Sequence, residues 1–425
     1  MAKSTLAPKG YVPHGYKKAF SVFVALYPIL CLYKAVSRFT IGDALLIAFV
    51  FVTLVHTMSV KVDMRFWAVA IFVLYAFVAL VFNLLLSPIT VQYGTTSLLW
   101  RIIKFIFYMV SVFVCSDNAL DFAVFRKALT ITAVIASLFL LLQYVLYFAF
   151  GKVVLGRVPF LTIYVEGYAQ QSTESIFRFN FRPSSLFFEP AMFAQYAIVP
   201  LTLNLYDKKN SPFDDRKTLW ITILLTVAIV LCTSGQGILY LAVAYVGYCA
   251  LFIKNRTKMA LILVLGLLVV VVGYFTVDAL KFAVDRLLFN ENASDVRLGT
   301  YSFCLSLEGA TMIWGYGYGT TPMSLWLAGA AYVWCGCGVV GLILAFCIFA
   351  AFIYRARGIA RRVLGILFVV MFFGTSLFYT YMAFWYFSIV SYGCGRFATA
   401  CQSEAIKIKA TSEFDGEMEN NSEIS

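Results

Sequence analysis

The chain has 425 residues, of which 62% are hydrophobic and only 13% are charged, and its formal net charge is +12. Soluble domains carry about 25% charged residues, so this composition excludes a water-soluble globular protein and predicts a chain that crosses a membrane several times. Nucleic-acid binding is also disfavoured, because the lysines and arginines occur in short groups between apolar segments, as membrane topology signals do.

Twelve apolar segments predict an all-α polytopic membrane helix bundle of about twelve transmembrane helices. A helix of about 20 residues spans the bilayer and satisfies its backbone hydrogen bonds internally. In chain order, the segments cover residues 19–33, 40–60, 66–86, 97–115, 128–150, 184–206, 218–233, 235–253, 259–277, 328–354, 363–378 and 380–396. The first segment lacks a convincing small-residue cleavage site, so we expect a retained helix there rather than a signal peptide.

The distribution of lysine and arginine predicts how the helices are oriented. If the N-terminus is cytoplasmic, most of the 33 basic residues lie on the cytoplasmic side, and every cytoplasmic loop carries at least two. Both chain ends are then cytoplasmic. Residues 1–401 form the predicted transmembrane domain, and residues 402–425 form an acidic, disordered cytoplasmic tail.

Two long connections, about 151–183 and about 278–327, are predicted on the outside of the membrane. Loops of this length are usually functional or disordered. Both are rich in aromatic residues, among them Tyr164, Phe181 and Trp314. We therefore expect them to pack onto the bundle or to enter the membrane surface.

The residue types give little support to metal or redox chemistry. The chain has ten cysteines but no CxxC pair, and its only histidines are His14 and His56. Zinc and redox sites use clusters of these residues. We therefore expect no metal and no cofactor.

The stretch RFNFRPSSLFFEPAMFAQY combines arginines with a carboxylate in an apolar segment. Arg178 and Arg182 come first, and Pro183 predicts the start of a helix because proline suits the first helical turn. Pro190 then predicts a kink beside Glu189, about 9 Å below that helix start. A carboxylate in this position costs free energy unless it faces water or pairs with a cation.

Two interpretations of Glu189 stay open. It can be an ion-pair partner of Arg182 or Arg101 that locks helices together, or it can take part in substrate binding or chemistry. Arg101 and Lys104 lie three residues apart, near the outside end of the segment 97–115, and share one helix face. They either reach lipid phosphates or line a pocket for an anionic substrate.

A second stretch, DVRLGTYSFCLSLEGATMIWGYGYGTT, lies in the second long loop. Arg297 is near its start, and Gly315, Gly317 and Gly319 are near its end. Glycine permits tight turns and close approach of the backbone to a ligand, although an ordinary loop before a helix is the alternative. The segment LCTSGQGILYL predicts a turn between two helices.

Three segments, in this order and spacing, resemble motifs of the Wzy-type polysaccharide polymerases. RPSSLFFEPAMFAQYAIVPL resembles the Phe–Glu–Pro segment that opens a membrane helix in that family. LCTSGQGILYLAVAYV resembles its threonine–serine turn, although Gln236 stands where the family often has arginine. Arg297 followed by WGYGYG resembles its second-loop arginine and glycine-rich helix entry, and the layout of helices and outside loops is also similar.

The resemblance implies a metal-independent glycosyltransferase in the bacterial cytoplasmic (inner) membrane. Such enzymes polymerise O-antigen or capsule repeat units on undecaprenyl diphosphate at the outer face of that membrane. The growing chain leaves its lipid diphosphate and joins the sugar of a new unit. The implied partners are the undecaprenyl-diphosphate-linked oligosaccharide and the lipid bilayer; a chain-length regulator protein is an open candidate.

The resemblance also implies roles for individual residues. The catalytic candidates are Glu189, Arg182 and Arg297, with Glu189 as a base or an orienting group and the arginines on diphosphate or glycan. The substrate-binding candidates are Arg178, Arg101, Lys104, Gly315, Gly317 and Gly319.

Two rival functions are compatible with this layout. The related O-antigen ligase moves a finished chain onto a lipid A core, but members of that family carry a functional histidine in the large outside loop, and both loops here lack histidine. A lipid-linked oligosaccharide flippase or other transporter is the second rival. Such transporters tend to have short loops and charges spread over many helices, whereas the charges here gather at one outside face.

Overall fold

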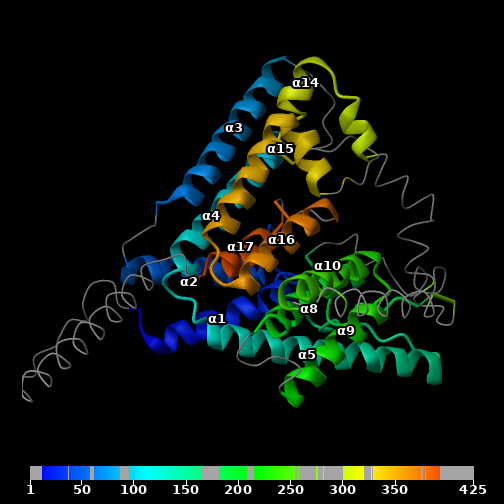
Figure 1. Ribbon diagram of the computed structural model, residues 1–425. Helices are drawn as coiled ribbons and strands as arrows, with labels where there is room; N and C mark the ends of the chain where they lie inside the picture. The colour runs from blue at the N-terminus through cyan, green and yellow to red at the C-terminus, as the bar shows by residue number, and fades with distance from the viewer. Residues whose placement is uncertain are drawn as a thin grey trace, which may run out of the picture.

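The computed structural model is predominantly helical over the residues that it describes (Figure 1). These are residues 12–36, 38–57, 62–86, 95–164, 181–207, 215–253, 257, 274–275, 281, 300–319, 327, 329–374, 377–378 and 380–392. The predicted segment 259–277 lies almost entirely outside this set, and the predicted tail 402–425 lies wholly outside it.

The helices follow the predicted apolar segments closely. They are α1 (His14–Leu30), α2 (Ile41–Thr57), α3 (Met64–Leu86), α4 (Thr95–Ser111), the π-helix η1 (Val112–Ser116), α5 (Phe122–Phe150), α8 (Pro190–Leu205), α9 (Arg216–Leu231), α10 (Gly235–Phe252), α14 (Gly309–Trp314), α15 (Gly329–Arg355), α16 (Ile359–Gly374) and α17 (Met382–Ser391). A two-stranded hairpin, β1 (Lys34–Val36) and β2 (Phe39–Thr40), connects α1 to α2.

Among the described residues, five helices are long and apolar enough to cross a membrane. The stretches are Met64–Asn83, Leu98–Ser116, Phe122–Phe150, Gly235–Phe252 and Gly329–Arg355. Ile41–Thr57 and Met382–Ser391 are shorter apolar helices. The predicted all-α bundle with several membrane-length helices is therefore confirmed in outline, whereas the number of twelve spans stays a prediction.

Helix α5 shows why a membrane suits this chain. One of its faces exposes an apolar stripe that recurs every three or four residues, the spacing of one side of a helix: Ile131, Ile135, Leu138, Leu142 and Val145. The opposite face is buried in the bundle. Because soluble proteins rarely expose such a contiguous apolar surface, lipid is the solvent that this face fits.

The helices form two groups that meet at α16 and α17 (Figure 1). Helix α1 packs on α5, and α8 packs on α9 and α10, which makes the first group. Helix α15 packs on α3, α14 and α16 and makes the second. Phe378, in the link from α16 to α17, packs on α4 and α15, with ring centroids 5.4 Å from Phe105 of α4 and 5.6 Å from Phe349 of α15.

The first long loop is tied to the N-terminal hairpin where the structure describes it. The backbone amide of Lys34 donates to the carbonyl oxygen of Thr162 at 2.8 Å, and the amide of Tyr164 donates to that of Leu32 at 3.0 Å. In the second long loop, the described residues include the short helix α14. Both loops thus pack onto the bundle over these residues, as their aromatic content predicted.

Candidate functional site

Glu189 stands at the start of α8, not inside a longer helix. Its backbone is extended, with φ −129° and ψ 144°, and Pro190 is the first helical residue. Its carbonyl oxygen accepts the amides of Met192 and Phe193 at 3.0 and 3.2 Å. The prediction that Pro183 begins the helix and that Glu189 lies about 9 Å further in is therefore wrong. Proline does mark the start of the helix, as expected, but the proline is Pro190. Glu189 is therefore half-buried at the positive end of the helix dipole.

Residues 181–189 are held out of helical conformation by a buried amide in α5. Gln143 accepts the backbone amide of Ser185 at 2.9 Å through Oε1, and its Nε2 donates to the carbonyl oxygen of Val154 at 2.7 Å. The Ser185 hydroxyl also donates to the carbonyl oxygen of Ala136 at 2.5 Å. One side chain thus fixes both ends of the first long loop, and no pattern in the sequence marked it.

Ser185 adopts a strained backbone conformation. Its φ is +55°, a value that residues with a Cβ rarely adopt. A Cβ at Gly156 would overlap the Ser185 carbonyl oxygen, so glycine is required where the two parts of the loop touch. Strain of this kind gathers at functional sites, where the surrounding structure enforces it.

The second strained residue lies in the turn between α9 and α10. Thr233 has φ +51°, and Ser185 and Thr233 are the two non-glycine residues with positive φ among those described. Ser234 caps α10 by accepting the amide of Gly237 at 3.4 Å. A Cβ on Gly237 would lie 3.0 Å from the Cβ of Ala194, so this turn packs tightly against the first turns of α8.

Arg182 joins these two segments. Its half-buried guanidinium is close enough to Tyr144 of α5 and to Cys232, which precedes Thr233, to interact with both electrostatically. This contact makes neighbours of the stretch RPSSLFFEP and the turn CTSGQG. Arg182 and Cys232, where the two segments begin, are 50 residues apart in the chain.

The end of α16 and the link that follows it connect this pair to the second long loop. Three side chains donate hydrogen bonds to carbonyl oxygens there: Tyr301 to Phe373 at 3.3 Å, Gln236 to Gly374 at 2.8 Å, and Tyr318 to Phe378 at 2.9 Å. Gln236 belongs to the CTSGQG turn, and the two tyrosines belong to the second loop. The three segments with motif-like sequence therefore meet at one end of the bundle.

Arg101 is bound to the last glycine of the WGYGYG stretch. Its Nη1 donates to the Tyr332 hydroxyl of α15 at 2.6 Å and to the Gly319 carbonyl oxygen, which the Tyr332 hydroxyl also reaches at 2.7 Å. Gly319 has φ +85°, and a Cβ there would lie 2.5 Å from Cδ of Arg101. Arg101 and Gly319, both predicted site residues, are therefore in direct contact.

Gly315 and Gly317 pack by backbone against a break in α15. The helix is interrupted at Gly338, with φ 66° and ψ −176°. Beside the break, the amide of Tyr316 donates to the Cys335 carbonyl oxygen at 2.8 Å, and that of Gly317 donates to Gly336 at 2.9 Å. Carbonyl groups freed from a helix in a membrane need such partners. The close approach accounts for the glycines structurally, while their predicted role in substrate binding stays a prediction.

Lys104 pairs with a buried carboxylate that the sequence analysis did not single out. Its Nζ lies 3.5 Å from Oδ2 of Asp43 and donates to the Tyr164 hydroxyl at 3.1 Å. Tyr108 and Tyr27 also donate to Asp43 Oδ1, at 3.0 and 3.3 Å. Lys104 therefore points into the bundle at this end of the molecule, where its ammonium compensates a buried charge.

A sequence signal for Asp43 did exist. Thr40 and Asp43 form a capping box at the start of α2: the Asp43 amide donates to Thr40 Oγ1 at 3.0 Å, and the Thr40 amide donates to Asp43 Oδ2 at 3.2 Å. The motif predicts where the helix begins. It does not predict a partner 61 residues further along the chain at Lys104.

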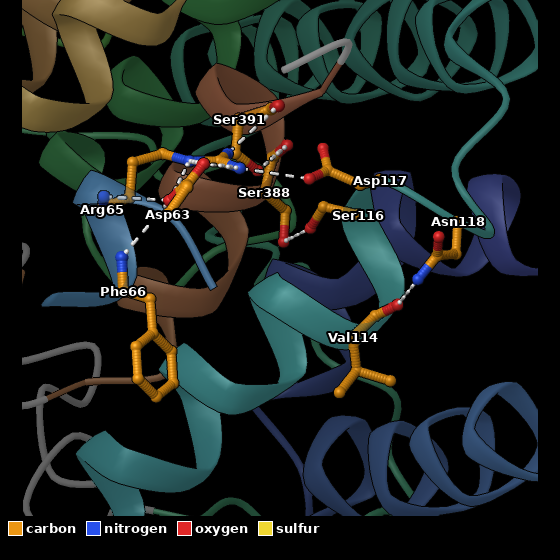
Figure 2. Close-up of polar contacts among 9 residues, drawn as sticks. All are labelled: Asp63, Arg65, Phe66, Val114, Ser116, Asp117, Asn118, Ser388 and Ser391. Atoms are coloured by element: carbon orange, nitrogen blue, oxygen red, sulfur yellow. Dashed lines mark hydrogen bonds and ion pairs between the residues drawn. The ribbon is translucent and has the colours of Figure 1, made fainter. Parts of the chain in front are cut away.

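A second buried ionic cluster lies at the opposite end of the bundle, where α3 begins (Figure 2). Arg65 is 1% exposed; its Nε donates to Asp63 at 2.9 Å, its Nη2 to Asp117 at 3.1 Å, and its Nη1 to the Ser391 carbonyl oxygen at 3.4 Å. Burial opposes ionisation of Asp63, but the hydrogen bonds and charge of Arg65 outweigh it and hold the pKa of Asp63 below its ordinary value. This cluster ties α3, η1 and α17 together.

The remaining predicted site residues, Arg178 and Arg297, lie outside the described residues. Among the described residues, no group of three or more histidine, cysteine or acidic side chains is arranged to hold a metal ion. No protein-family model matches the sequence, and no curated protein matches it significantly.

Proposed function

We propose that the chain is a membrane polysaccharide polymerase that extends an undecaprenyl-diphosphate-linked glycan by glycosyl transfer. The observation that carries this proposal is the meeting of three segments at one end of the bundle: the FRPSSLFFEP stretch, the CTSGQG turn and the second long loop. These segments carry the resemblance to Wzy-type polymerases. Hydrogen bonds to the carbonyl oxygens of Phe373, Gly374 and Phe378 join the turn to the second loop, and Gly237 of the turn packs against Ala194 near the start of α8.

The chemistry of this end suits a lipid-linked diphosphate. Arg182 supplies a guanidinium, which matches the geometry of phosphate oxygens, and the start of α8 favours negative charge. Apolar helix faces next to it allow a lipid-linked substrate to approach from the bilayer. Arg178 and Arg297 are the further diphosphate ligands that the proposal expects.

In the proposed reaction, a hydroxyl group on the incoming unit attacks the anomeric carbon of the growing chain. A new glycosidic C–O bond forms, and the bond from that carbon to the diphosphate oxygen breaks. The diphosphate leaves with the electron pair, stabilised by arginine, and Glu189 accepts the hydroxyl proton. Glu189 is proposed for this step because its half-buried carboxylate stands at the start of α8.

The contacts of Arg101 and Lys104 assign these residues a positioning role in the proposal. Arg101 holds Gly319 and Tyr332, and Lys104 holds Asp43 and Tyr164. The substrate-binding role predicted for them from the sequence stays a prediction.

Deletion of the gene in its own host tests the proposed function. Loss of a polymerase leaves single repeat units on the lipid A core or the lipid carrier, visible as one short band on a gel of the surface glycan. Loss of a ligase or a flippase removes all repeat units from the surface, and that result would contradict the proposal. Complementation with the wild-type gene should restore the ladder of long chains.

A further inference from the structure

A cavity of about 480 Å³ lies at the end of the bundle opposite the proposed polymerase site. It is lined by the start of α5, the end of α8, and the link between α15 and α16, and it is open to the surface. The direction of these helices places it at the end that the lysine and arginine distribution predicts to be cytoplasmic. Neither the proposed reaction nor the resemblance uses it.

The charges that line this cavity are predominantly positive. Three guanidinium groups, from Arg126, Arg357 and Arg361, face one carboxylate, Asp207. Asp207 is already paired, because its Oδ2 lies 2.5 Å from Nη1 of Arg126, while Nη2 of the same arginine donates to Asn204 at 3.0 Å. Three arginines and one aspartate leave the lining with a net positive charge; Arg357 follows α15, and Arg361 lies in the first turn of α16.

Arg361 is held in place by aromatic rings. Its guanidinium carbon lies 4.6 Å from the ring centroid of Phe122 and 4.5 Å from that of Tyr392. The two rings stack with centroids 5.1 Å apart. A guanidinium fixed in this way loses little conformational freedom when it binds an anion.

The first turn of α16 completes the lining. Gly358, Ile359 and Ala360 contribute to the cavity wall next to Arg361. The first amides of a helix have no acceptor within the helix, and the helix dipole favours negative charge at that end. Arginine side chains and a helix start therefore line the same cavity, and phosphate sites commonly combine these two features.

We propose that this cavity binds a phosphate group, carried either by the headgroup of an anionic phospholipid or by a soluble phosphate compound. Basic pockets between transmembrane helices on the cytoplasmic side suit anionic headgroups, because the phosphates of that leaflet lie at the same depth. The proposal is independent of the polymerase function and is tested by binding alone.

The test uses the purified full-length chain in detergent, with phosphatidylglycerol, phosphatidylcholine and inorganic phosphate as the three probes. Thermal unfolding is followed as each probe is titrated. We expect phosphatidylglycerol to raise the unfolding temperature and phosphatidylcholine to have little effect. Arg357→Gln should raise the probe concentration needed for half-saturation about tenfold, because a charged hydrogen bond is lost. Arg357 is exposed, so this variant should fold normally.

Arg362→Gln is the matched control. It removes the same charge five residues further along the chain, in the first turn of α16, but Arg362 is exposed and does not line the cavity. If the Arg357-dependent effect appears with phosphatidylglycerol alone, the ligand is a lipid headgroup; if inorganic phosphate reproduces it, the source is soluble phosphate. The proposal is overturned if neither probe acts through Arg357, or if Arg362→Gln weakens binding equally.

Discussion

Gln236 donates a hydrogen bond from Nε2 to the carbonyl oxygen of Gly374, at 2.8 Å, and so fastens the CTSGQG turn to the end of α16. The two residues are 138 positions apart in the chain. A Cβ on Gly374 would lie 2.5 Å from Nε2 of Gln236, so the contact also requires glycine. This bond connects the helix group of α8 and α10 to the link that carries Phe378.

Replacing Gln236 with alanine should destabilise the protein. The carbonyl oxygen of Gly374 loses its side-chain donor, and a hydrogen bond of this kind contributes about 1 kcal/mol to the free energy of unfolding. Thermal unfolding in detergent should show a lower midpoint, and polymer chains should shorten. Leu239→Ala, on the exposed face of the same helix, is the control and should change neither. Equal stability of the two variants would show that the bond contributes nothing.

Glu189→Gln should abolish polymerisation while the protein still folds. Loss of a general base lowers the rate by about 10²–10⁴-fold. Folding should survive because glutamine keeps the size of the side chain and its capacity to hydrogen-bond. Cells that express the variant should show single repeat units on a gel, at protein levels equal to wild type.

The matched control for Glu189 is Glu308→Gln. Glu308 also precedes a helix, α14, with an extended backbone and no capping hydrogen bond from its side chain, but it is exposed. Its removal should leave chain lengths unchanged. Wild-type chain lengths in the Glu189→Gln variant would demote Glu189 to a structural role.

Lys104→Met should be more damaging alone than together with Asp43→Asn. Asp43 is 1% exposed, and loss of its ammonium partner leaves a buried charge uncompensated, at a cost of about 3–5 kcal/mol. The double variant removes both charges and should recover part of that loss. Thermal unfolding of the two single variants and the double variant gives the coupling directly. Lys127→Met, at an exposed lysine, controls for loss of charge, and strictly additive losses would contradict the pairing.

The Asp63–Arg65 pair predicts a pH dependence of stability. The pKa of Asp63 is lowered in the folded protein, so its contribution is complete above the unfolded value of about 3.9 and is lost as the pH falls through the lower folded value. Wild type should therefore lose stability below about pH 4 more steeply than Asp63→Asn does. Unfolding midpoints measured between about pH 3 and pH 7 check this. A difference between the two proteins that stays constant over this range would exclude the linkage.

Hydrophobic periodicity and proline placement predicted most of the helices but not the start of α8. Both Pro183 and Pro190 follow a residue that proline biases away from helix, so the sequence offers two equivalent starts. The choice is made by Gln143 of α5, which binds the Ser185 amide and holds the intervening residues out of helical conformation. That contact joins residues 42 positions apart, and local sequence rules do not reach it.

In the candidate site too, some features were predicted from the sequence and others were not. Arginine and glycine content pointed to Arg101, Arg182 and Gly319, and contacts within the site now account for their positions. The hydrogen bonds to residues 373–378 and the Asp43–Lys104 pair were not predicted, because they depend on which helices become neighbours.

The most direct test of the proposed function is a reaction with purified components. The wild-type chain, reconstituted in vesicles, is given a synthetic undecaprenyl-diphosphate-linked repeat unit, and released undecaprenyl diphosphate is measured together with glycan length. We predict that each added repeat unit releases one lipid diphosphate, and that Glu189→Gln stops both processes while Glu308→Gln stops neither. Two results would contradict the proposed function. In one, the lipid-linked unit crosses the bilayer without being lengthened; in the other, the glycan is transferred to lipid A alone.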